Sequence, residues 1–100
     1  MDLSVNINIF NFNASRCASL RRIQQFYEYF EPYDPTFVCV QEISVISALK
    51  VFSDKYQVFV NLEPGVTDGI GIVTLVKKGI KVTDVIIGLN GRIIGVKLTN

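Results

Sequence analysis

One carboxylate of this 100-residue chain stands where a strand is expected to end. Glu42 follows the apolar run Phe37-Val38-Cys39-Val40, and a short run without polar alternation is typical of a strand that is covered on both faces. Open α/β sheets bind their ligands at the carboxyl ends of the strands. This position makes Glu42 the first candidate for a site residue.

Two asparagines form the second candidate group. Asn6 and Asn8 alternate with apolar residues over 3–9, so they project from one face of a predicted strand, about 7 Å apart. Carboxylate and amide oxygens are hard ligands suited to Mg²⁺, which takes one or two protein carboxylates and keeps several waters. If this strand neighbours the one that ends near Glu42, the three side chains converge on a cation. The alternative is that the asparagines bond to loops and the carboxylate is solvated.

The surrounding segments alternate between the periods of strands and helices. A stripe at three- and four-residue steps predicts an amphipathic helix between Ser15 and Phe30 that ends before Pro32. Strands are predicted over 3–9, 36–41, 57–61, 69–76, 80–87 and 92–98, with a helix capped by Ser44 that carries Ile46, Leu49 and Phe52, and a tight turn at Asn90-Gly91. The order predicts an α/β (α+β) fold: one mixed sheet with a crossover helix, followed by antiparallel hairpins.

Composition limits the function classes. The chain is 49% hydrophobic and 19% charged, which excludes a disordered linker. Its net charge of +1 gives no global basic field, so any contact with DNA must be local. Cys17 and Cys39, without any histidine, do not complete a four-ligand zinc site, and we expect both to be reduced and intracellular. No apolar run approaches membrane-spanning length, so we expect no membrane association.

The order of these motifs resembles the opening of the endonuclease/exonuclease/phosphatase superfamily, which includes abasic-site repair endonucleases and the endonuclease domains of non-LTR retrotransposons. The resemblance rests on Ser4-Val5-Asn6-Ile7-Asn8, the helix over 20–30, and the stretch from Tyr33 to Gln41-Glu42. Residues 69–80 and 90–94 are similar to retrotransposon endonucleases in particular. The resemblance implies that residues 1–100 form the N-terminal half of one domain, a partial four-layer α/β sandwich.

The resemblance also implies a metal-dependent endonuclease activity, a hydrolase that nicks DNA in the nucleus. Glu42 would bind Mg²⁺ (or Mn²⁺) directly, and Asn6 would support the metal and the scissile phosphate. Asn8, a position that is often aspartate in the repair enzymes, would complete the metal site. The family commonly has an aromatic residue before the first asparagine and a glycine after the second, whereas this chain has Val5 and Ile9 there.

The family's later catalytic motifs are absent from this sequence. It contains neither the family's Asp-x-Asn pair nor its Ser-Asp-His motif, and it has no histidine. We therefore expect an incomplete domain that does not cleave DNA alone, and that self-associates through an uncovered sheet face. Two alternatives remain open: a phosphatase-type member of the superfamily that acts on a phosphorylated lipid or sugar, and a non-catalytic binding module.

Overall fold

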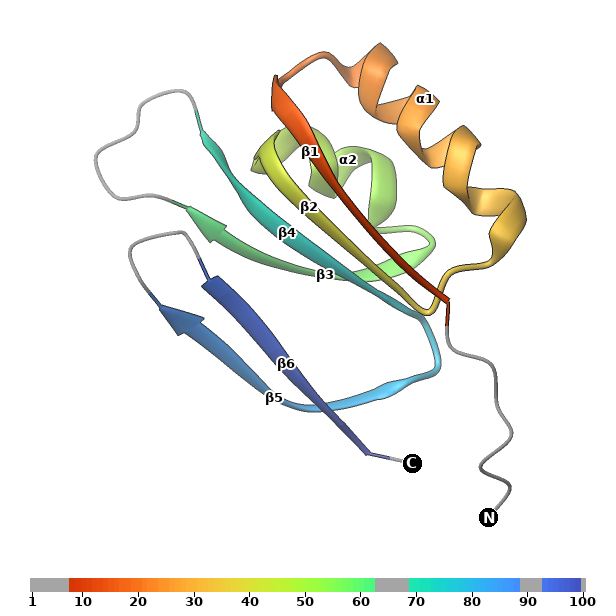
Figure 1. Cartoon of the computed structure of the whole chain (residues 1–100), viewed down its shortest axis with the longest axis vertical. Helices are drawn as coiled ribbons and strands as arrows, with labels where there is room; N and C mark the ends of the chain where they lie inside the picture. Colours follow the sequence, from red (N-terminus) through yellow and green to blue (C-terminus); the bar gives the residue numbers. More distant parts are fainter. Residues whose placement is uncertain (1–7, 63–68, 89–92, 100) are drawn as a thin grey trace.

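Two parallel strands joined by a crossover helix form the centre of the structure (Figure 1). The computed structural model describes residues 8–62, 69–88 and 93–99. Within these ranges the elements are β1 (Ile9–Cys17), α1 (Leu20–Phe30), the 3-10 turn η1 (Glu31–Tyr33), β2 (Phe37–Ser44), α2 (Val45–Phe52), β3 (Tyr56–Leu62), β4 (Ile70–Lys77), β5 (Lys81–Gly88) and β6 (Ile93–Thr99). The chain has the mixed α+β fold that its periodicity predicts.

Four of these strands form one mixed sheet, and the other two form a hairpin. The sheet order is β1-β2-β4-β3, in which β1 and β2 are parallel and the other neighbours are antiparallel. Strands β5 and β6 pair antiparallel. Both helices lie on the same face of the sheet (Figure 1). The crossover unit and the antiparallel second half are thus confirmed, while the predicted turn at Asn90-Gly91 lies outside the described residues.

The first strand that the structure describes begins where the predicted one ends. Strand β1 begins at Ile9, where the predicted strand over 3–9 ends, and residues 3–7 lie outside the described residues. Phe10 and Phe12 explain the position of β1, because both rings pack toward α1, with the Phe12 and Phe26 centroids 5.2 Å apart. Large aromatic rings contribute more buried apolar area than the aliphatic alternation that precedes them.

Serine side chains cap both helices. The Ser19 hydroxyl accepts a hydrogen bond from the backbone N–H of Arg22 at 3.3 Å, and that of Ser44 accepts one from Ser47 at 3.3 Å. Each bond satisfies an N–H that a helix start leaves without a partner. The cap at Ser44 is confirmed. The helix predicted within 15–30 is confirmed as α1 over Leu20–Phe30, and Ser15 lies in β1.

An aromatic cluster fills the space between the sheet and the helices. Phe30 and Phe52 are 1% and 0% exposed, and their ring centroids lie 5.8 Å apart. Phe30 also contacts Phe10 and Tyr56, with centroids 6.2 and 6.0 Å away. Burial, with added repulsion from nearby ionisable groups, raises the pKa of Tyr56 from 10.0 to about 12. Its phenol is therefore neutral at physiological pH and acts as a core residue.

Helix α2 buries a different stripe from the predicted one. Val45, Ala48 and Phe52 are buried, whereas Ile46 and Leu49 are 63% and 39% exposed. The strand β2 runs directly into the helix, so the residue after the cap already points into the core and fixes the buried face. None of the described helices is long and apolar enough to cross a membrane.

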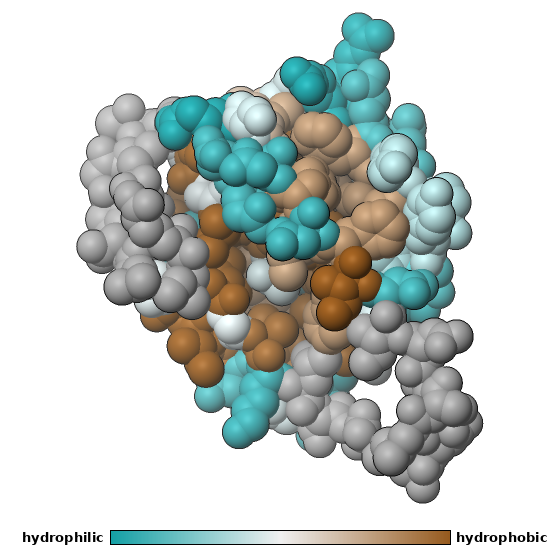
Figure 2. Space-filling view, viewed as in Figure 1, coloured by the Kyte–Doolittle hydropathy of each residue, from teal (hydrophilic) through white to brown (hydrophobic). Residues whose placement is uncertain are grey.

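The β5–β6 hairpin lies against the second face of the sheet, on the side of β3 and β4. The side-chain amide of Asn61 donates to the Gly88 carbonyl at 3.2 Å, and that of Gln57 donates to the Ile80 carbonyl at 2.6 Å. A cleft of about 240 Å³ remains between sheet and hairpin, and its lining includes Cys39, Gln41, Ile72, Thr74 and Ile94. Figure 2 shows hydrophilic residues, in teal, over the upper front of the molecule and hydrophobic residues, in brown, beside them.

Candidate functional site

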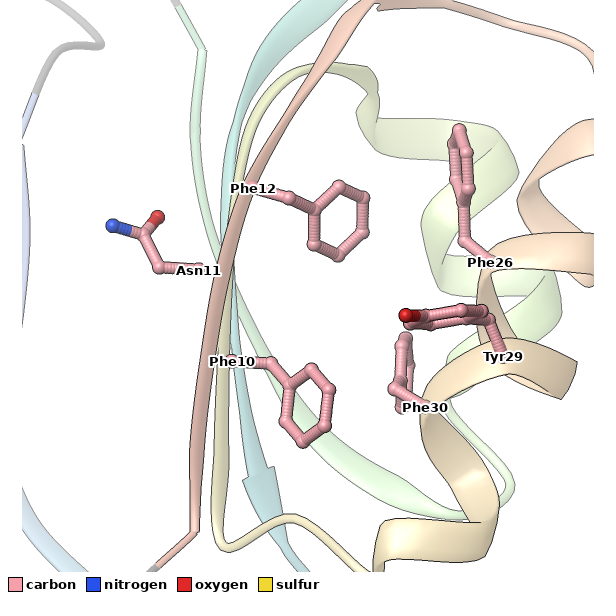
Figure 3. Close-up of a pocket in the computed structure, with 6 residues that line it drawn as sticks. All are labelled: Phe10, Asn11, Phe12, Phe26, Tyr29 and Phe30. Atoms are coloured by element: carbon pink, nitrogen blue, oxygen red, sulfur yellow. The ribbon is translucent and has the colours of Figure 1, made fainter.

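Polar side chains of β1 and β2 gather where the regular pairing of the two strands ends. Because the two strands are parallel, Asn13 lies in register with Gln41, and Asn11 with Cys39. Figure 3 shows the Asn11 side chain on the opposite face of β1 from Phe10 and Phe12. The aromatic residues of β1 thus face the helices, and its amides face the other side of the sheet.

Two side-chain hydrogen bonds connect the strands on this polar face. The amide nitrogen of Asn13 donates to Oε2 of Glu42 at 2.6 Å, and the amide nitrogen of Gln41 donates to Oδ1 of Asn11 at 2.7 Å. The other end of the Asn13 amide accepts a bond from the backbone N–H of Ser15 at 2.7 Å. Asn13 therefore fixes both the Glu42 carboxylate and the backbone at the end of β1. We call Asn11, Asn13, Gln41 and Glu42 the amide–carboxylate site.

Both strands lose their regular geometry at this site. Ser15, Arg16 and Glu42 have φ of 54°, 59° and 55°, in the left-handed region. The register of β1 with β2 shifts after Asn13, and that of β2 with β4 shifts after Val40. Bulges of this kind re-aim side chains and are common beside functional sites. A left-handed conformation costs a residue with a Cβ about 1–2 kcal/mol, so Glu42 holds its position against a local strain.

The site differs from the predicted one in its asparagines. Asn6 lies outside the described residues. Asn8 does not approach Glu42: its side chain donates to the Tyr33 carbonyl at 3.0 Å, and its own carbonyl accepts from Thr36. It lies five residues before Asn13 on a strand path, which corresponds to about 16 Å. The predicted convergence of Asn8 with Glu42 is therefore wrong, because the parallel register places Asn8 beside Phe37 at the amino end of β2, whereas Glu42 lies beyond Gln41 near its carboxyl end.

The residues that sequence reasoning missed are Asn11 and Asn13. The signal is present, since Phe10, Asn11, Phe12 and Asn13 alternate as clearly as the residues before them. The phase of the alternation reverses at Ile9. A single regular strand would therefore turn the apolar residues before and after Ile9 to opposite faces of the sheet.

The chemistry of the amide–carboxylate site fits a hard divalent cation with one protein carboxylate. The Glu42 carboxylate accepts one bond from Asn13, and two carboxylate oxygens together have about four acceptor positions. The amide oxygens of Asn11 and Asn13 already accept hydrogen bonds from Gln41 and Ser15. They therefore orient the side chains of the site rather than serve as ligands of a cation. Among the described residues no three acidic, histidine or cysteine side chains cluster around one point. An ion at this site would have one protein carboxylate as a ligand and would keep most of its waters, as Mg²⁺ usually does in proteins.

Cys39 lies beside the site and does not supply a thiolate. Burial raises the pKa of the Cys39 thiol above its usual value of 9.0. The thiol is therefore protonated at neutral pH, and both cysteines are free of disulfides. A thiol in this state is a poor nucleophile and a poor metal ligand.

The strain at Glu42 gives a stability prediction. Glu42→Gly is expected to be more stable than Glu42→Ala by about 1 kcal/mol, because both variants lose the bond from Asn13 and only glycine relieves the left-handed conformation. Urea unfolding of the two variants measures this difference. An alanine variant that equals or exceeds the glycine variant would show that residue 42 is not left-handed in solution.

No protein-family model and no curated protein matches this chain.

Proposed function

We propose that the amide–carboxylate site binds Mg²⁺, and that the chain is the metal-binding part of a Mg²⁺-dependent phosphodiesterase that nicks DNA, as retrotransposon endonucleases do. The observation that supports this proposal is the Glu42 carboxylate, held at 2.6 Å by Asn13 where the regular pairing of the two parallel strands ends. The resemblance to the endonuclease/exonuclease/phosphatase superfamily adds DNA as the substrate and the nucleus as the place of action.

The asparagine roles that the resemblance implies are better assigned to Asn11 and Asn13 than to Asn6 and Asn8. The family pattern has an aromatic residue before the first asparagine and a glycine after the second. Phe10 precedes Asn11, and the small residue Ala14, which is 5% exposed, follows Asn13. With this assignment an aromatic residue precedes the first asparagine, as in the family pattern. The residue after the second asparagine differs from the family's glycine by one methyl group.

Each residue of the site then has a definite role. Glu42 would hold the ion, and Asn13 would orient Glu42. Asn11 is exposed, and Gln41 fixes its amide through the oxygen, so its amide nitrogen is a donor for a phosphate oxygen. When bound, Mg²⁺ polarises a scissile phosphate and stabilises the leaving oxygen. With no histidine in the sequence, a water at the site has no imidazole to take its proton.

Cation-dependent DNA binding tests this proposal. A fluorescently labelled DNA duplex is expected to bind the chain more tightly in Mg²⁺ than in EDTA, and Glu42→Gln is expected to remove that difference. Glu28→Gln is the matched control, because it removes an exposed carboxylate on α1 and leaves the site intact. Binding that is equal in Mg²⁺ and EDTA, or that Glu42→Gln leaves unchanged, would contradict the proposal.

Supercoiled plasmid separates binding from cleavage. The chain alone is expected to leave plasmid intact in Mg²⁺, because the site orients a cation and a phosphate without a base. Robust nicking that Glu42→Ala abolishes would show that the described site is sufficient for hydrolysis, contrary to this expectation.

A further inference from the structure

Strand β1 is an edge strand of the sheet among the residues that the structure describes. It stands at the end of the order β1-β2-β4-β3. The Asn8 carbonyl points to β2, where it accepts from Thr36 and Phe37, so the backbone groups of Ile9 and the alternate residues after it point away from β2. Exposed edges are usually guarded by lysine, proline or a bulge. From Ile9 to Asn13 the edge has no charge and no proline, and the irregularity of β1 lies after this stretch, between Asn13 and Cys17.

An aromatic groove lies along this edge. It has a volume of about 310 Å³ and is lined by Phe10, Phe12, Phe26, Tyr29, Phe30 and the backbone side of Asn11 (Figure 3). Tyr29 is 73% exposed, and the rings of Phe10, Phe12 and Phe26 are only half-buried. A strand added to β1 with an apolar residue at every second position would place those side chains in the groove.

Helix α1, which forms one wall of the groove, has its charges reversed relative to its dipole. Arg21 and Arg22 lie in its first turn, with no acidic residue there, while Glu28 lies in its last turn and Glu31 follows it, with no basic residue there. Helices favour the opposite arrangement. A second helix that runs antiparallel beside α1 and has the same sequence would set basic residues against acidic residues at both ends.

These observations favour one occupant for the edge, a second copy of this chain. We infer that two chains pair through antiparallel β1 strands around a two-fold axis perpendicular to the sheet, with their α1 helices antiparallel on the same face. Two registers fit this symmetry, one with Phe12 opposite Phe12 of the second copy and one with Asn11 opposite Asn11. In both registers the phenylalanines of β1 lie on the helical face of the sheet in both copies, and the asparagines lie on the other face. The inference goes beyond the proposed function and does not depend on it.

A charge-swap experiment tests the antiparallel arrangement. Sedimentation equilibrium of the chain is expected to give twice its 11.2 kDa mass at micromolar concentration. An acidic variant, Arg21→Glu with Arg22→Glu, and a basic variant, Glu28→Lys with Glu31→Lys, are each expected to weaken self-association by at least about tenfold, since like charges then face one another. A mixture of the two variants is expected to restore a dimer. The acidic variant suits the helix dipole at its first turn, so its fold is retained, as circular dichroism would verify.

A matched pair of lysine substitutions tests the edge itself. Ile9 on β1 and Ile46 on α2 are 64% and 63% exposed. Ile9→Lys places a charge on the edge strand and is expected to weaken the dimer, because a charged edge opposes pairing with another strand. Ile46→Lys is expected to leave the dimer unchanged. A chain that stays monomeric at all concentrations, or an oligomer that resists Ile9→Lys and the charge swap, would overturn the inference. An oligomer lost in Ile46→Lys would also overturn it, in favour of the exposed face of α2.

Discussion

Gly71→Ala is expected to lower the free energy of unfolding by about 3 kcal/mol or more, because the new methyl group would meet backbone rather than a mobile side chain. Gly71 lies in β4, between β2 and β3, in register with Ile43 and Leu62. A Cβ at this position would collide with the Asn61 carbonyl oxygen, and would lie 3.2 Å from the Leu62 Cα. Alanine therefore requires β3 to move away from β4.

The matched control for this substitution is Gly95→Ala, in β6. A Cβ there would lie 3.6 Å from Cβ of Ile86, which is an ordinary contact. Alanine at this position is expected to be neutral or slightly stabilising, since it reduces the entropy of the unfolded chain. Urea unfolding measures both variants. If Gly71→Ala proved as stable as Gly95→Ala, the described pairing of β3 with β4 would be wrong.

Asn13→Asp is expected to destabilise the cation-free chain at neutral pH by about 1–3 kcal/mol, and Mg²⁺ is expected to restore the loss. The substitution replaces the donor to Oε2 of Glu42, now at 2.6 Å, by a second carboxylate. Two carboxylates repel each other only while both are ionised, and protonation removes that repulsion. The destabilisation is therefore absent at pH below about 4 and grows as the pH rises toward neutrality. Thermal unfolding with Mg²⁺ or EDTA at several pH values measures it.

Asn8→Asp is the control for this prediction. Its amide nitrogen donates to the Tyr33 carbonyl at 3.0 Å, so aspartate loses a bond there as well. It has no carboxylate partner in the site, and its loss is expected to be the same in Mg²⁺ and EDTA. Equal Mg²⁺ rescue of the two variants would point to a general salt effect, and no rescue of Asn13→Asp would count against a cation at Glu42.

The sequence predicts the order of the elements, but it does not predict where along the chain the first described strand begins. The helix over 20–30, the cap at Ser44 and the strands after it follow from local periodicity and turn residues. The N-terminal stretch contains two alternations in opposite phase that meet at Ile9. The choice between them depends on packing against α1, where Phe10 and Phe12 contact Phe30 and Phe26. Periodicity along the chain contains no information about that contact.

The candidate site is also predictable from the sequence only in part, because periodicity along the chain does not report tertiary contacts. Glu42 is identifiable because a carboxylate that follows an apolar strand has a defined place at the sheet edge. Its left-handed conformation, with φ of 55°, is not identifiable, because residues that adopt it are commonly glycine or asparagine. The hydrogen bond from Asn13 to Glu42 is not predictable from the sequence either, since it depends on the register that aligns Asn13 with Gln41.

A cation at Glu42 is tested most directly by the paramagnetic broadening that substoichiometric Mn²⁺ causes in the side-chain amide signals of NMR spectra of the chain. A cation at Glu42 is expected to broaden the amide signals of Asn11, Asn13 and Gln41 first, to spare Asn8, and to lose this effect in Glu42→Gln. Broadening that centres on Asn8, affects all amides equally, or persists in Glu42→Gln would contradict the assignment of a cation site at the ends of β1 and β2.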